Sequence, residues 1–277
     1  MSQLPTLESI DRYCDAAPAF TAARVELGAF TLFINPVGWP YYARPTIDGP
    51  TPTTADVQQV LEVQRERGVP RSFEWVHERT PGLAEIMSKL GHTVHFNPLL
   101  ALPYGAKVTT SSDVPVRLME PADPDVGLVN AVASVGFASP GGAIGPESID
   151  SLLPTMADRT PEFDAYERMR LERGITVTMC VESDGGPVSV GALNPVGDVA
   201  EICGIATLPA YRNRGYGSAV TAALAAHATN IGIRDLFLGA GDDRTARIYE
   251  GVGFVRVGTA CEVEATPAHP PVSLSSA

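Results

Sequence analysis

The 277-residue chain is poor in the features that mark secreted, metal-stabilised or membrane proteins. Its four cysteines are far apart and form no CxxC pair, which argues against a disulfide framework or a zinc site. Residues 1–20 contain neither a basic nor an apolar signal region. No run approaches the roughly 18 apolar residues of a membrane span. We therefore expect a cytoplasmic protein with no membrane association and no metal.

Charged residues are also scarce, at 19%, while hydrophobic residues reach 44%, which is ample for a packed core. The net charge of −12 is uneven, because residues 1–103 carry −3 and residues 104–277 carry −9. Such a field disfavours nucleic acid and attracts cationic ligands to the C-terminal half. Acidity that serves solubility alone explains the charge equally well.

Two polar segments suggest how the chain is divided. Residues 104–115, "YGAKVTTSSDVP", are low in large apolar groups and end in proline, as linkers do. Residues 265–277 are rich in proline and serine and are expected to form a flexible tail. These boundaries predict one domain over 1–103 and a second over 116–264.

The second domain shows a mixed pattern of elements. Helices are expected over 121–137, 160–174 and 217–232, around strands at 175–182, 187–194 and 199–207. Short turns join these three strands into an antiparallel meander, and a helical crossover then leads to a parallel strand at 235–240. A short helix and a last strand follow. The predicted class is α/β (α+β), with a mixed, mostly antiparallel sheet flanked by helices.

The N-terminal part ends in a similar order of elements. Residues 72–102 read as strand, helix, glycine and strand, and alignment with 235–264 sets Gly91 on Gly253 and Met87 on Tyr249. The helix candidate at 54–68 then matches 217–232. The sequence thus suggests a diverged internal repeat.

The stretch "RNRGYGSAV", residues 212–220, joins a strand to a helix and has the character of a phosphate-binding loop. Glycines let the backbone approach an anion, and the free N–H groups of a helix N-terminus point at it. A Walker loop is excluded because GxxxxGK[ST] is absent, and a Rossmann loop because Val220 stands at the third glycine position. The pattern [RQ]xxGxG is met by Arg212, Gly215 and Gly217.

"EICGIATLPAYRNRGYGSAV" followed by "ARIYEGVGFVRVG" resembles the GNAT superfamily of N-acetyltransferases. The resemblance covers about residues 120–264, and the N-terminal repeat resembles a second, degenerate copy. It implies acetyl-CoA as co-substrate and no metal. The pantetheine arm would lie along Ile205, Ala206 and Thr207. The pyrophosphate would meet the loop and first helical turn, namely Arg212, Asn213, Arg214, Gly215, Tyr216, Gly217 and Ser218.

Asp243 is a departure from this pattern, because many family members carry asparagine there. A carboxylate is less favourable towards CoA phosphates, although Arg244 and Arg247 offset it. We keep Asp243 as a candidate cofactor contact.

Tyr249 is the expected general acid, since a phenol stays protonated near neutral pH and can supply a proton to the leaving thiolate. The alternative is a tyrosine that only packs in the core. The resemblance implies that Glu201 is the base for the attacking amine, because several GNAT members place a carboxylate on this strand eleven residues before the position of Arg212. A structural or substrate-binding carboxylate, or deprotonation by water, stays open. Strand alternation places Glu201, Cys203 and Ile205 on one face, and a covalent route through Cys203 is disfavoured because small buried cysteines are common.

The sequence therefore predicts an acetyl-CoA-dependent N-acetyltransferase that acts by direct attack in a ternary complex. The acceptor is expected to be a primary amine of a small molecule or peptide, and cationic. The alternative is a non-catalytic acyl-CoA-binding or scaffold protein. The N-terminal repeat lacks the glycine loop and carries Met87 in place of tyrosine, so one active site per chain is expected. Monomer and homodimer both stay open.

Overall fold

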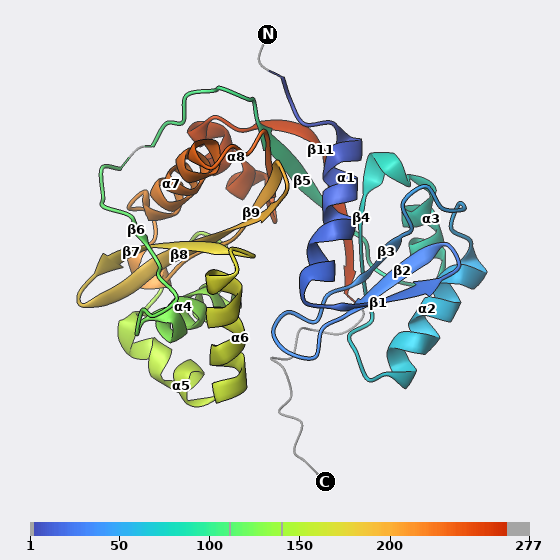
Figure 1. Cartoon of the computed structure of the whole chain (residues 1–277), viewed down its shortest axis with the longest axis horizontal. Helices are drawn as coiled ribbons and strands as arrows, with labels where there is room; N and C mark the ends of the chain where they lie inside the picture. Colours follow the sequence, from blue (N-terminus) through green and yellow to red (C-terminus); the bar gives the residue numbers. More distant parts are fainter. Residues whose placement is uncertain (1–2, 111, 140, 265–277) are drawn as a thin grey trace. The chain divides into compact units, whose positions relative to one another are not determined.

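The computed structural model describes residues 3–110, 112–139 and 141–264 (Figure 1). The chain divides into two compact units. Among the described residues, unit 1 contains residues 3–5 and Leu100–Arg256, and unit 2 contains Thr6–Leu99 and residues 257–264. The expected tail lies outside the described residues. The expected C-terminal domain extended to residue 264, whereas residues 257–264 of the last strand group with unit 2.

Unit 1 is a mixed sheet with helices on both faces, which confirms the predicted fold class. Its strands follow the order β5-β10-β9-β8-β7-β6. They are β5 (His95–Leu102, of which 100–102 belong to this unit), β6 (Arg117–Leu118), β7 (Val177–Ser183), β8 (Gly186–Val196), β9 (Val199–Thr207) and β10 (Asp235–Gly239). Its helices are α4 (Val126–Ala138), α5 (Leu152–Ala157), α6 (Pro161–Glu172), α7 (Tyr216–Asn230) and α8 (Asp243–Val252), with 3₁₀ turns at Ile149–Ser151 and Pro209–Tyr211.

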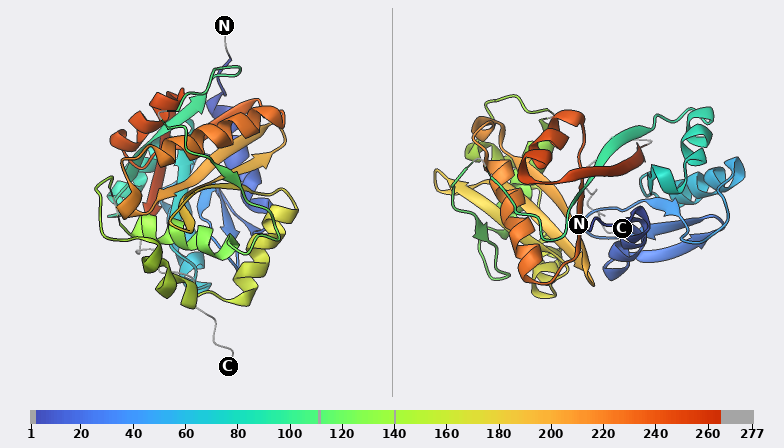
Figure 2. Two further views of the ribbon diagram at one scale, coloured as in Figure 1. Left: turned by 90° about the vertical axis from the view of Figure 1, so that its left-hand side faces the viewer. Right: turned by 90° about the horizontal axis from the view of Figure 1, so that it is seen from above.

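The helices of unit 1 form two layers. α7 and α8 lie on one face of β7, β8 and β9, and α4, α5 and α6 lie on the other (Figure 1, Figure 2). α7 is rich in alanine, a strong helix former whose small side chain lets the helix pack closely on β8. Val220 and Leu224 of α7 are fully buried there. The meander of β7, β8 and β9 is antiparallel and the β9–β10 pair is parallel, both as predicted.

A β-bulge interrupts β9. Val190 of β8 pairs with Ala206, but Ala192 pairs with Cys203, so β9 has one extra residue around Gly204. Gly204 adopts a φ of +63°, which favours glycine. The bulge reverses the alternation of side chains beyond it, so the expectation that Ile205 shares a face with Glu201 and Cys203 is wrong.

Packing on the two faces shows the same reversal. A Cβ on Gly191 would overlap Ile205 and approach Val220 of α7, so Ile205 lies on the α7 face. A Cβ on Gly136 of α4 would approach the Cβ of Ala206 at 3.0 Å, so Ala206 lies on the α4 face. Cross-strand pairing places Cys203 and Glu201 on that same α4 face.

Unit 2 repeats the element order of unit 1. Its strands follow the order β1-β2-β3-β4-β11, with β3 and β4 parallel and the other assigned pairs antiparallel. They are β1 (Ala23–Leu27), β2 (Phe30–Ile34), β3 (Ala43–Pro45), β4 (Ser72–Val76) and β11 (Val255–Glu264, of which 257–264 belong to this unit). Its helices are α1 (Leu7–Ala16), α2 (Thr54–Glu66) and α3 (Gly82–Lys89), with 3₁₀ turns at Ala17–Phe20 and His77–Arg79.

Charged side chains hold two of the helices of unit 2. α1 covers one face of the sheet, and Asp11 of α1 forms an ion pair with the fully buried guanidinium of Arg44 on β3. α2 begins with a capping box, in which Thr53 and Asp56 satisfy one another's backbone N–H groups. The hydrogen bonds from Thr53 hold the pKa of Asp56 below its usual value. The N-terminus of α2 is thus occupied by its own carboxylate.

Candidate functional site

β9 and β10 pair over only a short stretch. Their register runs from Val199–Asp235 to Glu201–Phe237 and goes no further within the described chain, although β9 continues to Thr207. The β10-facing edge of residues 203–207 is therefore left without a strand partner. An unpaired edge offers alternate N–H and C=O groups to an extended ligand, which can add like another strand. The predicted pantetheine contacts Ile205, Ala206 and Thr207 all lie on this edge.

The loop after β9 leads to an open helix N-terminus. Asn213 and Gly215 adopt positive φ values of 62° and 77°, and Gly215 is the N-cap of α7. No side chain caps this helix, and its first turn of Tyr216, Gly217 and Ser218 carries no acidic residue. Because the first N–H groups of a helix have no intrahelical partner, they and the helix dipole are available to an anion.

Arg212 occupies the beginning of the loop but does not direct its guanidinium to this N-terminus. It donates to the carbonyl oxygens of Thr207 at 3.2 Å, Gly136 at 2.8 Å, Ser139 at 2.7 Å and Ala143 at 3.2 Å. The side chain thus connects the end of β9, the end of α4 and the segment that follows α4.

Two other arginines supply positive charge nearby. Arg214 is exposed, with its guanidinium 5.2 Å from the ring centroid of Tyr211. Arg244 of α8 is exposed and reaches the carbonyl of Gly142 at 3.5 Å, where Asn213 also donates at 3.4 Å. The loop after β9, through Asn213, and α8, through Arg244, therefore both contact Gly142.

Asp243 is engaged on the surface of α8. Its carboxylate accepts a hydrogen bond from Arg256 Nη1 at 2.6 Å. The preceding residue, Asp242, caps α8 by accepting from the backbone N–H of Thr245 at 2.6 Å. The N-terminus of α8 is therefore closed by a side chain, unlike that of α7.

Glu201 lies at the point where β9 and β10 part, as the last residue of β9 that pairs with β10. Its side chain is half-buried, and burial raises its carboxyl pKa from 4.5 to about 7. A carboxyl group with this pKa exchanges protons near neutral pH, which is what a general base requires. The site thus contains one carboxylate with the right chemistry at the inner end of the open edge.

Cys203 lies near Glu201 on β9, and Tyr249 of α8 lies near Cys203. The thiol of Cys203 accepts from Asn194 Nδ2 at 3.2 Å, and burial raises its pKa to about 12. The thiol also interacts electrostatically with Glu201 and with Tyr249, whose pKa is raised chiefly by burial. Both Cys203 and Tyr249 are therefore protonated at neutral pH: the first is a poor nucleophile and the second a competent proton donor.

A polar chain on the α4 face supports this cluster and was not foreseen from the sequence. Arg170 of α6 donates to Asn194 Oδ1 at 3.4 Å, and Asn194 stands opposite Glu201 on β8. Glu167 forms an ion pair with Arg170 at 3.5 Å. These residues come from distant segments, so no local pattern could have grouped them.

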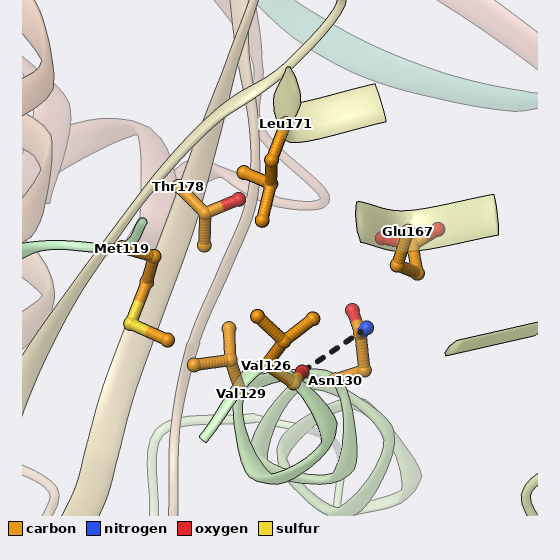
Figure 3. A pocket seen from close by; sticks show the side chains of 7 residues that line it. All are labelled: Met119, Val126, Val129, Asn130, Glu167, Leu171 and Thr178. Carbon is orange, nitrogen blue, oxygen red and sulfur yellow. Dashed lines mark hydrogen bonds between the residues drawn. The ribbon is translucent and has the colours of Figure 1, made fainter. Parts of the chain in front are cut away.

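A separate small pocket opens near α4 and α6 (Figure 3). Its cavity volume is about 10 Å³, which is room for about one water molecule and far below the roughly 300–1,000 Å³ of most ligand sites. The pocket is lined by the amide of Asn130 and the carboxylate of Glu167. Its other lining residues are Met119, Val126, Val129, Leu171 and Thr178. No predicted site residue lines it, so we do not assign the cofactor there.

The described residues contain neither a membrane-spanning helix nor a metal-binding cluster. None of the helices there has the length and apolar character needed to cross a bilayer. No group of three or more His, Cys, Asp or Glu side chains is placed to hold a metal ion in the same residues.

The fold and the site together define a mixed α/β domain with an open strand edge leading to an uncapped helix. Residues 148–254 match the model of the Acetyltransferase (GNAT) family. This segment of the chain is therefore a GNAT domain, as the motif resemblance predicted.

Solved structures share the fold over nearly the whole chain. A GCN5-related N-acetyltransferase from Kribbella flavida superposes with a TM-score of 0.67 at 20% identity, covering 96% of this chain and 98% of that one. A GCN5-related N-acetyltransferase-like protein from Streptococcus suis gives 0.55 at 10% identity, covering 93% and 98%. A putative GNAT acetyltransferase from Novosphingobium aromaticivorans gives 0.50 at 16% identity, covering 88% and 92%. The search of curated proteins gave no match.

Proposed function

We propose that the chain is an acetyl-CoA-dependent N-acetyltransferase with a single active site, located in unit 1. The observation that carries this proposal is the continuity of the open β9 edge, the uncapped N-terminus of α7 and the pair Glu201 and Tyr249. A reacting thioester, an extended arm and a pyrophosphate need a proton-transfer pair, an open strand edge and a helix N-terminus in that order along one path, which Glu201 with Tyr249, the β9 edge and α7 provide. The family match of residues 148–254 supports the acyltransferase class.

Each part of the site has a distinct role in this proposal. The edge residues Ile205, Ala206 and Thr207 hold the pantetheine arm through backbone groups. The amides of 212–218 hold the pyrophosphate, and Arg214 and Arg244 add charge around it. Asp243, paired with Arg256, contributes at most its backbone. Bound acetyl-CoA supplies an activated acyl group.

Glu201 accepts a proton from the acceptor's ammonium group, directly or through water. A neutral amine then attacks the thioester carbonyl. Tyr249 donates its phenolic proton to the sulfur as the carbon–sulfur bond breaks. The proton that the attacking nitrogen loses as the amide forms returns to the Tyr249 phenolate through solvent, and burial, which raises the pKa of Tyr249, keeps the resting phenol protonated.

The acceptor is a primary amine of a small molecule or peptide. A cationic amine is favoured because the carboxyl group of Glu201 lies on the α4 face at the inner end of the open edge. We also propose that unit 2 is a degenerate GNAT-like domain. Its α2, which corresponds to α7, is closed by Asp56, so it offers no equivalent anion site.

Isothermal titration with CoA, followed by detection of CoA release from acetyl-CoA with a panel of amines, tests the proposal. We expect one CoA per chain and turnover with at least one cationic amine. Binding without turnover on any amine would favour a non-catalytic acyl-CoA-binding protein. Absence of CoA binding would overturn both functions.

A further inference from the structure

Arg212 stands in the position where the motif suggests a phosphate contact, but its guanidinium is committed elsewhere. Four carbonyl oxygens accept from it, at distances from 2.7 to 3.2 Å. A guanidinium has a fixed fork of donors, so these bonds use nearly its full set. Binding a phosphate through this side chain would leave several of those carbonyls without a donor.

Two of the four carbonyls belong to the end of α4. Gly136 and Ser139 lie in and directly after its last turn, where helix carbonyls have no intrahelical partner. α4 has no basic residue of its own in its last turn. Arg212 therefore provides, from a distant segment, the cation that the negative end of a helix dipole favours.

The end of α4 packs directly on the edge that we assign to the pantetheine arm. At Gly136 an added Cβ would approach the Ala206 Cβ at 3.0 Å and the Thr207 amide nitrogen at 3.5 Å. The absence of a side chain lets the helix approach the strand this closely. The position of α4 therefore decides what stands beside residues 206 and 207.

We propose that Arg212 is a positioning residue that holds the end of α4 and residues 141–143 against β9. Its guanidinium is not a phosphate ligand, and the positive charge for the phosphates comes from Arg214 and Arg244. Binding at the cofactor loop is thereby coupled to the position of the end of α4 and of residues 141–143. This inference rests on the proposed function only for the identity of the ligand.

Hydrogen exchange and CoA titration of four variants test the proposal. Arg212→Ala and Arg212→Lys both remove the forked guanidinium, and Arg214→Ala removes an exposed charge of the loop. Arg173→Ala is a matched control at the exposed arginine that follows α6 as its C-cap. Amide hydrogen exchange in peptides that cover the end of α4 should be about tenfold or more faster in both Arg212 variants than in the wild-type protein. It should stay unchanged in Arg214→Ala and Arg173→Ala. The affinity for CoA should change less than about threefold in Arg212→Lys and fall about tenfold in Arg214→Ala.

Arg212→Lys separates geometry from charge, because lysine keeps the charge but cannot span carbonyls of three segments. In the wild-type protein, CoA should further protect the end of α4, and this gain should be lost in Arg212→Lys although CoA still binds. The positioning role would be overturned if CoA still protected the end of α4 from exchange in Arg212→Lys. It would also be overturned if exchange at the end of α4 in Arg212→Ala equalled that of the wild-type protein. A wild-type protein that fails to bind CoA would overturn the proposed function, while the exchange of the ligand-free variants would still decide the role of Arg212.

Discussion

Replacing Glu201 by Gln should change stability and activity in opposite directions. Burial raises the carboxyl pKa of Glu201 from 4.5 to about 7, so the folded protein favours the protonated group. The stabilisation is complete below pH 4.5 and is lost as the pH rises through about 7. Glutamine has nearly the same shape and never ionises, so the variant avoids this loss.

The size of the effect follows from the two pKa values. Ionising a group with this shift costs the fold about 1 kcal/mol near pH 5.5 and about 3 kcal/mol near pH 8.5. The advantage of Glu201→Gln over the wild-type protein should therefore grow by roughly 2 kcal/mol across that range. Any constant difference between glutamine and a protonated glutamate cancels in this comparison.

Equilibrium urea unfolding of both proteins at the two pH values measures the change. In parallel, kcat/KM of the wild-type protein should rise with pH through about 7 as the carboxylate forms. In Glu201→Gln, kcat/KM should fall by about 10²-fold or more and should no longer rise with pH in this range. A stability difference that does not vary with pH would refute the raised pKa. An unchanged rate in Glu201→Gln would remove Glu201 as the base, whatever its pKa.

Three other substitutions test separate parts of the structure. Tyr249→Phe should lower turnover by about 10²-fold and leave the CoA affinity within about twofold, and an unaltered rate would leave the acid unassigned. Gly191→Ala adds a Cβ that overlaps Ile205 and lies 2.8 Å from Val220 Cγ1, so urea unfolding should show a loss of about 1–3 kcal/mol. Asp56→Ala should cost about 1 kcal/mol through loss of the α2 capping box and leave CoA titration unchanged. A weaker CoA affinity in that variant would place a cofactor site in unit 2.

Local pattern was enough to predict the meander, the parallel crossover and the continuous loop of unit 1. Strand 199–207 and the helix after it lie where hydrophobic pattern and glycines indicated, because the whole cofactor path is contiguous in sequence. α1 and α5 were not predicted, nor were the first three strands. β1 is mostly exposed and β3 has three residues, so neither shows the alternation that marks a strand.

The sequence-based account of the site failed where geometry depends on a single residue or on distant segments. Strict alternation placed Ile205 beside Glu201, and one glycine inside the strand, Gly204, reversed it. A glycine within a strand pattern is a signal for a bulge and could have been used as one. The four carbonyl partners of Arg212 and the link from Arg170 through Asn194 could not be inferred, because they depend on how α4 and α6 fold onto the sheet.

The two units show how small a change opens or closes an anion site on the same arrangement of elements. In both, an antiparallel strand is followed by a helix and a parallel strand. At α7 the N-cap is Gly215 in a left-handed conformation, and no carboxylate stands in the first turn. At α2 the N-cap is Thr53, the carboxylate of Asp56 accepts from the Thr53 N–H, and Thr53 Oγ1 accepts from the Asp56 N–H. Since an internal carboxylate and a phosphate compete for the same N–H groups, the capping that stabilises α2 also excludes a pyrophosphate there. The cofactor site that we propose in unit 1 thus depends on the absence of a stabilising side-chain cap at α7.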